Sequence, residues 1–275
     1  MTYTVLLAVL FGILEGVTEW LPISSTAHLL LLRHLLPIDL YRTAFFSLFE
    51  VVIQLFALLP VLLRFWPMLW PFYHKQGAAR QAVWRLWGKI LTAALPAAVL
   101  GLFLNTAIEE RLSTPPVIAT ALIGYGLLFL LPFARKSEAA ARCRDLQALS
   151  YGSAFAIGLF QVLALLPGTS RSGATVLGAL LLGISRTTAA LFSFFLGIPT
   201  MLGATALRTL AFLQSGTVLT APEWLTLFIG CAVSFFVSLL TVDFLMSFVR
   251  RHSFFAFGIY RILLGIAVLL TLIFL

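Results

Sequence analysis

Apolar segments long enough to cross a lipid bilayer recur along the whole chain, and they restrict its fold more than any other feature. Of the 275 residues, 61% are hydrophobic and only 10% are charged. A helix crosses roughly 30 Å of hydrocarbon with about 20 apolar residues and satisfies its own backbone hydrogen bonds. The composition excludes an ordinary soluble domain and predicts an all-α polytopic membrane protein, a single domain over residues 1–275.

Six segments are apolar throughout and are predicted to be transmembrane helices. They are residues 41–65, 87–105, 115–134, 187–208, 223–249 and 255–274. Two further apolar segments carry polar interruptions: residues 2–36 break near Pro22, and residues 149–183 break near Pro167. Each is either an unbroken polar-lined span or a re-entrant hairpin of two half-helices, which protein or a wet cavity must cover at membrane depth.

The basic residues in the loops favour the hairpins. The loop from Arg64 to Lys89 carries five basic residues and no acid, and the loop from Arg135 to Asp145 carries four. With two hairpins, both loops share one face, which is cytoplasmic by the positive-inside rule. We therefore expect periplasmic termini and inverted repeats of approximately residues 1–134 and 149–275. Membrane orientation explains the net charge of +8, and no nucleic-acid partner is expected.

The two interrupted segments also resemble each other in sequence. "GILE" at residues 12–15 matches "GLFQ" at residues 158–161, and "LPISS" at residues 21–25 matches "LPGTS" at residues 166–170. Paired interruptions in two halves of a membrane protein typically mark a binding site at the midplane. We expect the two interruptions to meet inside the bilayer and form one phosphate-handling site.

Acids, hydroxyls and a histidine are concentrated in the first interruption, "TEWLPISSTAH". Glu15 and Glu19 are four residues apart and share a helix face; intramembrane acids are functional candidates by default. A run of hydroxyls after Pro22 suits the start of a new half-helix, whose N-terminus attracts anions. That run is Ser24, Ser25 and Thr26. His28 follows one turn after Ser25 and is a candidate acid or base.

The second interruption, "LPGTSRSGAT", has the composition of an oxyanion clamp. Pro167 and Gly168 permit a tight turn, and Gly173 lets backbone approach closely. Arg171 supplies a fixed fork of donors that suits phosphate, unless it serves only as a structural ion-pair partner of the acids. The surrounding hydroxyls are Thr169, Ser170, Ser172 and Thr175.

Other polar residues in the apolar spans are weaker candidates. Arg261 is expected to pair with an acid such as Asp243 or to snorkel. Glu50 and Gln54 repeat the spacing of four residues and either extend the site or bond across the bundle.

A divalent cation, Mg²⁺ or Ca²⁺, is the cofactor that the oxygen-rich residues suggest, with Glu15 and Glu19 as its ligands. No cysteine and histidine cluster indicates zinc. Cys143 and Cys231 form no disulfide or metal pattern.

The two interruptions resemble the motifs of the undecaprenyl-diphosphate phosphatase family of bacterial inner membranes, the bacitracin-resistance type. The family's G-x-x-E-G-x-T-E-[FW]-L-P-x-S-S-T-G-H stands here as "GILEGVTEWLPISSTAH", with Ala27 where glycine is usual, and P-G-x-S-R-S-G-[AS]-T stands as "PGTSRSGAT". Shorter matches, such as "FEVVIQL", "FSFFLGIPTMLGATAL" and "YRILLG", extend over nearly the whole chain. We expect alanine at position 27 to be tolerated, with a slightly stiffer turn.

The resemblance implies hydrolysis of undecaprenyl diphosphate to undecaprenyl phosphate and inorganic phosphate, which recycles the lipid carrier of cell-wall synthesis. It implies an inner-membrane location and a site open to the periplasm. Carried over, Glu15 and Glu19 would bind metal or activate the nucleophile, Ser25 would be that nucleophile, and His28 an acid or base. Arg171 would hold the diphosphate. The other phosphate ligands would be Ser24, Thr26, Gly168, Thr169, Ser170, Ser172, Gly173 and Thr175.

Several alternatives remain after the resemblance. Either a serine phospho-enzyme or direct attack by water fits the residues. An acid-phosphatase-like enzyme does not fit, because Leu177 stands where that class needs a histidine after Ser170-Arg171. A lipid flippase would use the same binding residues. Only phosphate release distinguishes the two functions, because a flippase does not cleave the lipid. The expected partners are the polyprenyl diphosphate substrate and membrane lipids. The sequence does not decide whether the chain forms a homodimer.

Overall fold

The structure is a computed structural model that describes residues 2–35, 43–74, 77–135 and 138–274. Its helices are α1 (Thr2–Thr18), α2 (Ser25–Leu35), α3 (Thr43–Arg64), α4 (Trp66–Leu69), α5 (Ala78–Leu112), α6 (Pro115–Leu130), α7 (Tyr151–Val162), α8 (Arg171–Leu181), α9 (Arg186–Gln214), α10 (Ala221–Arg251) and α11 (Phe255–Phe274). Short 3₁₀ turns join some of them. Parts of the predictions lie outside the described residues: residue 36, residues 41–42, Lys75 and Lys136.

Five helices among the described residues are long and apolar enough to cross a membrane: α3, α5, α9, α10 and α11. This confirms a polytopic all-α membrane protein. The predicted span 115–134 yields only the 16-residue helix α6. It ends at Leu130 because Leu131 precedes Pro132 and takes an extended conformation, as residues before proline usually do.

α5 begins at Ala78 rather than at residue 87, so the basic loop is shorter than predicted. Lys89, assigned to that loop from the sequence, is a buried helical residue. Its Nζ donates hydrogen bonds to the carbonyl oxygens of Leu146 and Gln147 at 3.1 and 2.9 Å. The loop assignment of Lys89 was wrong, because an ammonium group can stay inside a helix bundle when carbonyl oxygens satisfy it.

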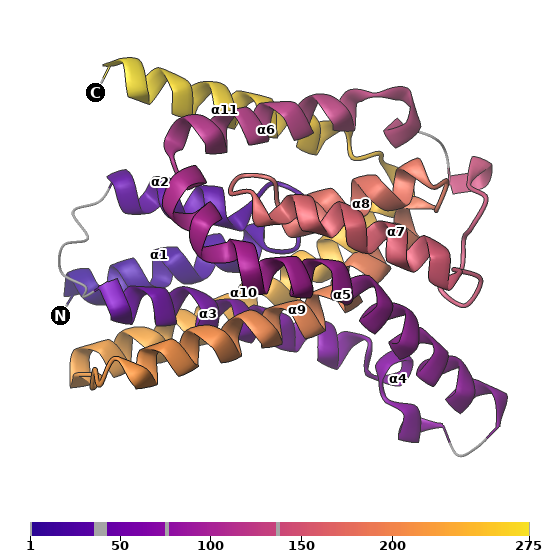
Figure 1. Ribbon diagram of the computed structural model, residues 1–275, viewed down its shortest axis with the longest axis horizontal. Coiled ribbons are helices and arrows are strands. Elements are labelled where there is room, and N and C mark those ends of the chain that lie inside the picture. The colour runs from indigo at the N-terminus through magenta and orange to yellow at the C-terminus, as the bar shows by residue number, and fades with distance from the viewer. Residues whose placement is uncertain (1, 36–42, 75–76, 136–137, 275) are drawn as a thin grey trace.

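Each interrupted segment folds as two short helices joined by a turn at the expected place. α1 ends at Thr18 and α2 begins at Ser25, whereas α7 ends at Val162 and α8 begins at Arg171. Figure 1 shows the α1–α2 hairpin at the end of the molecule where both termini lie, and the α7–α8 hairpin at the opposite end. Their turns face each other in the middle of the bundle.

Long helices hold the two hairpins by close backbone contact. α1 packs against α10, and α7 packs against α5. A Cβ atom at Gly12 would lie 2.8 Å from the carbonyl oxygen of Gly230, and one at Gly158 would clash with the carbonyl of Ala93. Any larger side chain at these glycines would push a hairpin away from its partner helix, so these contacts set the position of both turns.

Candidate active site

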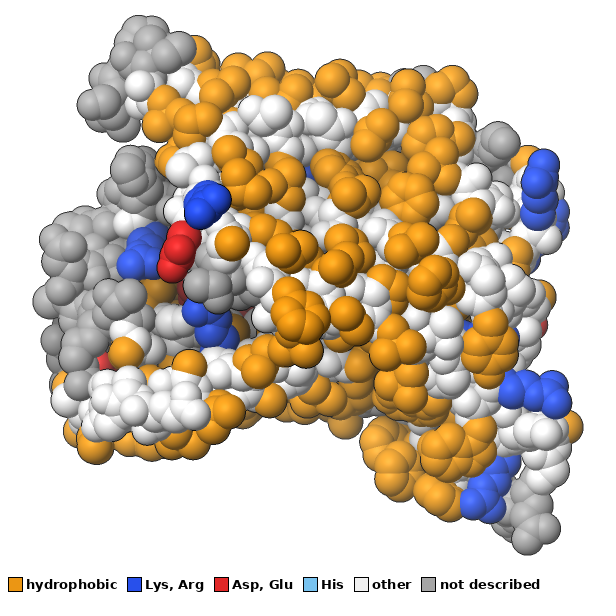
Figure 2. Space-filling model, in the orientation of Figure 1, with side chains coloured by type: hydrophobic (Ala, Val, Ile, Leu, Met, Phe, Trp, Pro, Cys, Tyr) orange, Lys and Arg blue, Asp and Glu red, His pale blue; other side chains and the backbone are white. Residues whose placement is uncertain are grey.

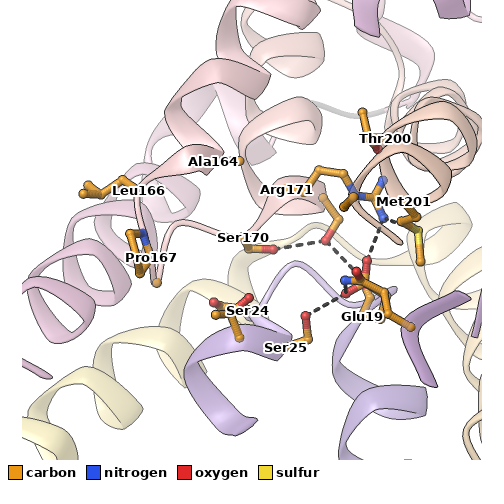
Figure 3. A pocket seen from close by; sticks show the side chains of 15 residues that line it. Glu19, Ser24, Ser25, Ala164, Leu166, Pro167, Ser170, Arg171, Thr200 and Met201 are labelled. Atoms are coloured by element: carbon orange, nitrogen blue, oxygen red, sulfur yellow. Dashed lines mark hydrogen bonds and ion pairs between the residues drawn. The ribbon is translucent and has the colours of Figure 1, made fainter. Parts of the chain in front are cut away.

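A pocket of about 180 Å³ lies where the two turns meet (Figure 3). The first turn and α2 contribute Glu19, Ser24, Ser25 and Thr26 to its wall. The second turn and α8 contribute Leu166, Pro167, Gly168, Ser170, Arg171 and Ser172. The expectation that the two interruptions meet is therefore confirmed, and the pocket is lined mainly by hydroxyl, carboxylate and guanidinium groups.

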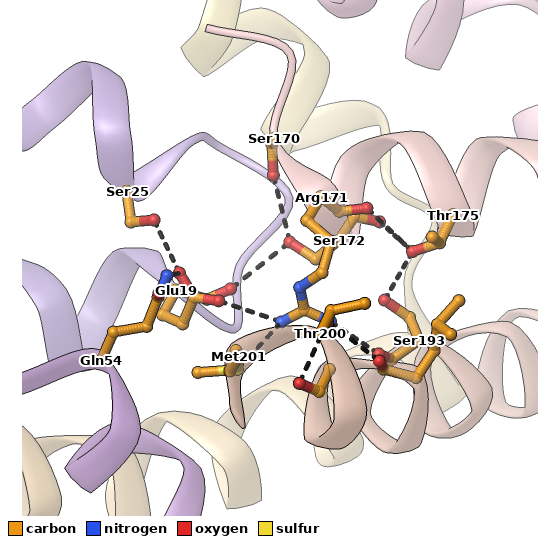
Figure 4. Close-up of polar contacts among 12 residues, drawn as sticks. Glu19, Ser25, Gln54, Ser170, Arg171, Ser172, Thr175, Ser193, Thr200 and Met201 are labelled. Carbon is orange, nitrogen blue, oxygen red and sulfur yellow. Dashed lines mark hydrogen bonds and ion pairs between the residues drawn. The ribbon is translucent and has the colours of Figure 1, made fainter. Parts of the chain in front are cut away.

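Glu19 is the residue on which the polar side chains converge (Figure 4). Its Oε1 accepts a hydrogen bond from Arg171 Nη2 at 3.0 Å. Its Oε2 accepts from Ser25 Oγ at 2.7 Å and from Gln54 Nε2 at 3.2 Å. Gln54 lies on α3 and also lines the pocket. Both sequence alternatives therefore hold for this residue: it bonds across the bundle and it extends the site.

The guanidinium of Arg171 packs against α9. Its Nη1 donates to the carbonyl oxygen of Ser193 at 2.7 Å, and its Cζ lies over the Trp20 ring, 5.8 Å from the centroid. A Cβ atom at Gly197 would lie 2.7 Å from Nη1, so only a glycine leaves room for this packing. The guanidinium is thereby fixed, with Nη2 directed at Glu19 (Figure 4).

The N-termini of α2 and α8 both border the pocket, and each is capped in the same way. Ser24 and Ser170 are the described non-glycine residues with positive φ, 75° and 72°. Ser24 Oγ accepts from the backbone N–H of Ala27 at 3.4 Å, and Ser170 Oγ accepts from that of Gly173 at 3.1 Å. Ala27 is helical, so alanine costs no strain there. Two positive helix ends at one pocket suit a ligand with two negative groups.

Arg261 is a residue whose role the sequence analysis missed. Its side chain is fully buried, with 0% exposure. Nη1 donates to the carbonyl oxygen of Pro22 at 3.1 Å, and Nη2 donates to those of Gly168 and Thr169 at 2.9 Å each. One guanidinium therefore ties the backbones of both turns together.

The expected partner of Arg261 was wrong. Asp243 instead forms an ion pair with Arg64 at 2.7 Å on the exposed surface. Snorkelling is also excluded, because the guanidinium is fully buried. The sequence signal was a single arginine inside a 20-residue apolar helix without any acid of its own, which marked Arg261 as unusual but did not identify its partner.

Some predicted site residues lie close to the pocket without lining it. His28 Nδ1 is 2.7 Å from the carbonyl oxygen of Ser24, and Nε2 is 2.7 Å from Tyr260 Oη, so both ring nitrogens are engaged. Glu15 is buried, and its two carboxylate oxygens have no hydrogen-bond partner among the described residues. Thr169, Gly173 and Thr175 are also absent from the described wall.

Thr175 has a clear structural contact. Its hydroxyl lies 2.7 Å from Ser193 Oγ and donates to the carbonyl oxygen of Arg171 at 2.9 Å. It therefore joins α8 to α9 behind Arg171, on the far side of the guanidinium from Glu19. Thr200 and Met201 of α9 line the pocket, although the motifs of the two interruptions gave no sign of them.

The fold and the pocket define a class: a multi-pass membrane protein with a buried polar site suited to an anion. The chain matches the family described as bacitracin resistance protein BacA over residues 8–267. It is 47% identical over 269 residues to an undecaprenyl-diphosphatase of Enterococcus faecalis, covering 97% of this chain and 96% of the relative. It is 46% identical over 270 residues to that of Lacticaseibacillus casei, covering 98% and 99%. It is 45% identical over 268 residues to that of Streptococcus mutans, covering 97% and 95%. This chain belongs to the BacA family.

Proposed function

We propose that the chain hydrolyses undecaprenyl diphosphate to undecaprenyl phosphate and inorganic phosphate in the pocket between the two turns. The family and the names of its relatives support this substrate. The observation that carries the assignment is the convergence of the Ser25 hydroxyl and the Arg171 guanidinium on Glu19. The reaction recycles the lipid carrier of cell-wall polymer synthesis and confers resistance to bacitracin.

Ser25 is the nucleophile in this proposal. Its Oγ forms a bond to the terminal phosphorus while the bond from that phosphorus to the bridging oxygen breaks, and undecaprenyl phosphate leaves. Glu19 Oε2, 2.7 Å from Oγ, accepts the hydroxyl proton. A water oxygen then bonds to the phosphorus of the phosphoserine while the bond from Ser25 Oγ to that phosphorus breaks. Glu19 returns its proton to Oγ, and inorganic phosphate leaves. Arg171 and the N-termini of α2 and α8 stabilise the charge on the phosphoryl oxygens.

Glu15 fits a divalent cation, Mg²⁺ or Ca²⁺, better than Glu19 does. Both oxygens of Glu15 are buried without a hydrogen-bond partner in the described part of the chain, whereas those of Glu19 are bonded to side chains. The described residues contain no group of three histidine, cysteine or acidic side chains suited to a metal, so oxygens of water or of the substrate would complete the ligand set. When bound, the cation supplies positive charge to the phosphate oxygens.

The proposed orientation has a cytoplasmic face at the basic loops and periplasmic termini, with the pocket open to the periplasm. Both hairpins are then re-entrant, and α6 completes six spans in two inverted repeats. The location of both termini at one end of the bundle supports this arrangement (Figure 1). So does the exchange of packing partners, in which α1 contacts α10 and α7 contacts α5.

Phosphate release by purified protein in detergent tests the proposal. Wild type should release phosphate from undecaprenyl diphosphate, and Glu19→Gln should lose nearly all activity because the carboxylate that contacts Ser25 and Arg171 is gone. Thr120→Ala is the control, since it removes an exposed hydroxyl on α6 that donates to the carbonyl oxygen of Pro116 and does not line the pocket. A chelator should abolish release, and Mg²⁺ or Ca²⁺ should restore it.

A lipid flippase is the alternative that the opposed hairpins would also suit. It would bind the same lipid diphosphate but release no phosphate. If folded wild-type protein bound the lipid diphosphate but released no phosphate, the hydrolase proposal would be wrong and a flippase function would be favoured.

A further inference from the structure

An aromatic and basic projection lies at the end of the molecule opposite the termini. It comprises α4, the 3₁₀ turn Pro71–Tyr73 and the first turns of α5, and is called the spur below. Figure 1 shows that the spur diverges from the bundle, and Figure 2 shows apolar and basic side chains on its surface. Its large aromatic residues are 42% to 58% exposed. They are Trp66, Trp70, Phe72, Tyr73 and Trp84.

The spur is an ordered surface. Trp66 and Trp70 stack with ring centroids 4.8 Å apart, and Phe72 packs edge-on against both Trp70 and Trp84. The indole N–H of Trp87 donates to the carbonyl oxygen of Leu69 at 2.7 Å and so fastens α4 to α5. The exposed rings therefore hold a fixed arrangement.

The spur is positively charged without compensating acids. No aspartate or glutamate occurs between Arg64 and Lys89. The Arg80 guanidinium lies 4.4 Å from the centroid of the Phe72 ring, a stacking mode that leaves its N–H edges free to donate. Within the described residues, neither Arg80 nor Arg85 has an ion-pair partner.

We propose that the spur binds the headgroups of anionic phospholipids. Tryptophan and tyrosine favour the boundary between hydrocarbon and water, where an apolar ring and a polar N–H or O–H are both satisfied. The chain is a membrane protein, and the spur begins where the span of α3 ends at Arg64. Arginines at this depth meet lipid phosphates, and each one strengthens attraction to an anionic surface. A headgroup phosphate supplies the acid that the spur lacks.

The base of the spur is connected to the second hairpin. Lys89 Nζ holds the carbonyl oxygens of Leu146 and Gln147, shortly before α7 begins. Tyr151, the first residue of α7, reaches the carbonyl oxygen of Arg85 at 3.5 Å. Lipid bound to the spur therefore stabilises the start of α7, and with it the hairpin that carries Arg171.

Lipid retention by the full chain tests this inference. The protein is placed in nanodiscs of phosphatidylcholine with a minor fraction of phosphatidylglycerol, extracted with mild detergent, and the retained lipids are counted by mass spectrometry. Wild type should retain phosphatidylglycerol well above its share of the bilayer. The double variant Arg80→Gln/Arg85→Gln should lose about tenfold of that preference.

The matched control is Arg250→Gln/Arg251→Gln, which removes two exposed arginines at the end of α10. It should keep the preference, because those arginines lie outside the spur. Trp66→Ala/Trp70→Ala should lower total lipid retention. Cooperative thermal unfolding shows that each variant is folded, and phosphatidylglycerol should raise the Tm of wild type but not of the Arg80/Arg85 variant.

An equal loss of phosphatidylglycerol preference in the Arg80/Arg85 and Arg250/Arg251 variants would show that only the net charge of the protein matters, and would overturn the inference. Unchanged retention in the Arg80/Arg85 variant would also overturn it. A change of oligomeric state in the spur variants, with lipid retention intact, would identify the spur as a contact between copies of the chain instead.

Discussion

The turns of the two hairpins share a backbone design but carry opposite chemistry. Each has a serine with positive φ that caps the following helix, Ser24 in one and Ser170 in the other. The helices that follow, α2 and α8, are both 11 residues long. The first helical residue is Ser25 in α2 and Arg171 in α8. Equivalent positions thus supply the hydroxyl and the guanidinium that meet at Glu19.

The backbone and the side chains therefore contribute separately to the site. Both backbones direct a helix N-terminus at the pocket, which suits the two negative groups of a diphosphate. The side chains differ between the two hairpins. The first supplies the carboxylate of Glu19 and the hydroxyl of Ser25, and the second supplies the guanidinium of Arg171. Glu15 and Gln161 continue the pattern: both are buried, and neither has a side-chain hydrogen bond among the described residues.

The largest expected effect comes from removing the hydroxyl of Ser25, which follows the first turn. Ser25→Ala should lower kcat for phosphate release by about a thousandfold or more, because it removes the proposed nucleophile. Thr120→Ala on α6, outside the pocket, is the control and should keep the activity of wild type. Phosphoserine detected at position 25 in quenched wild-type reactions would support the covalent route. Retained activity in Ser25→Ala would assign the attack to water.

The second largest effect is expected at Arg171, which follows the second turn. Arg171→Lys keeps the charge but loses the fork that joins the Ser193 carbonyl oxygen to Glu19. We expect kcat to fall by about a hundredfold, the usual cost of one oxyanion donor. Initial rates at saturating substrate measure it. Activity near that of wild type would show that only the charge matters there.

The third prediction concerns the link between the two turns. Arg261→Met leaves the carbonyl oxygens of Pro22, Gly168 and Thr169 without their donor. It should destabilise the protein by about 3 kcal/mol, because buried acceptors lose their partner. Thermal unfolding of Arg261→Met, with Arg250→Met as the exposed control, tests this value. Equal Tm values for the two variants would contradict the role as a clamp.

The smallest expected effect tests whether the turns are equivalent. Ser24→Gly and Ser170→Gly each lose a helix cap but gain a residue that adopts positive φ without strain. Glycine at such a cap costs only a few tenths of a kcal/mol, so both variants should unfold within about 1 kcal/mol of wild type. A large loss in one variant alone would show that the turns are held by different forces.

The sequence match between the two interruptions aligns the turns one residue away from the register that the structure shows. "LPISS" and "LPGTS" align Ser25 with Ser170, whereas the caps pair Ser24 with Ser170. The structural register is also the spacing that separates Gly12 from Gly158. Short motifs are aligned by residue type, whereas a helix cap is defined by backbone geometry. Residue type alone does not show which of two neighbouring serines has that geometry.

Local patterns in the sequence sufficed for the breaks in both hairpins and for most of the pocket wall. Prolines, glycines and hydroxyls mark where an apolar helix stops, because these residues act on their own backbone. The partner of Arg261 could not be found in this way. Any acid in the chain was a candidate, and only packing revealed that neutral carbonyl oxygens surround the guanidinium.

The sequence alone determined that this chain crosses a membrane repeatedly, and that two polar motifs interrupt its apolar segments, because hydropathy and helix-breaking chemistry are local properties. The tertiary structure decided which groups meet. Arg171 contacts Glu19 across 152 residues of chain, and His28 faces Tyr260 rather than the pocket. Such pairs depend on how the long helices hold the two hairpins, since a buried polar group bonds to whatever partner the packing brings within reach.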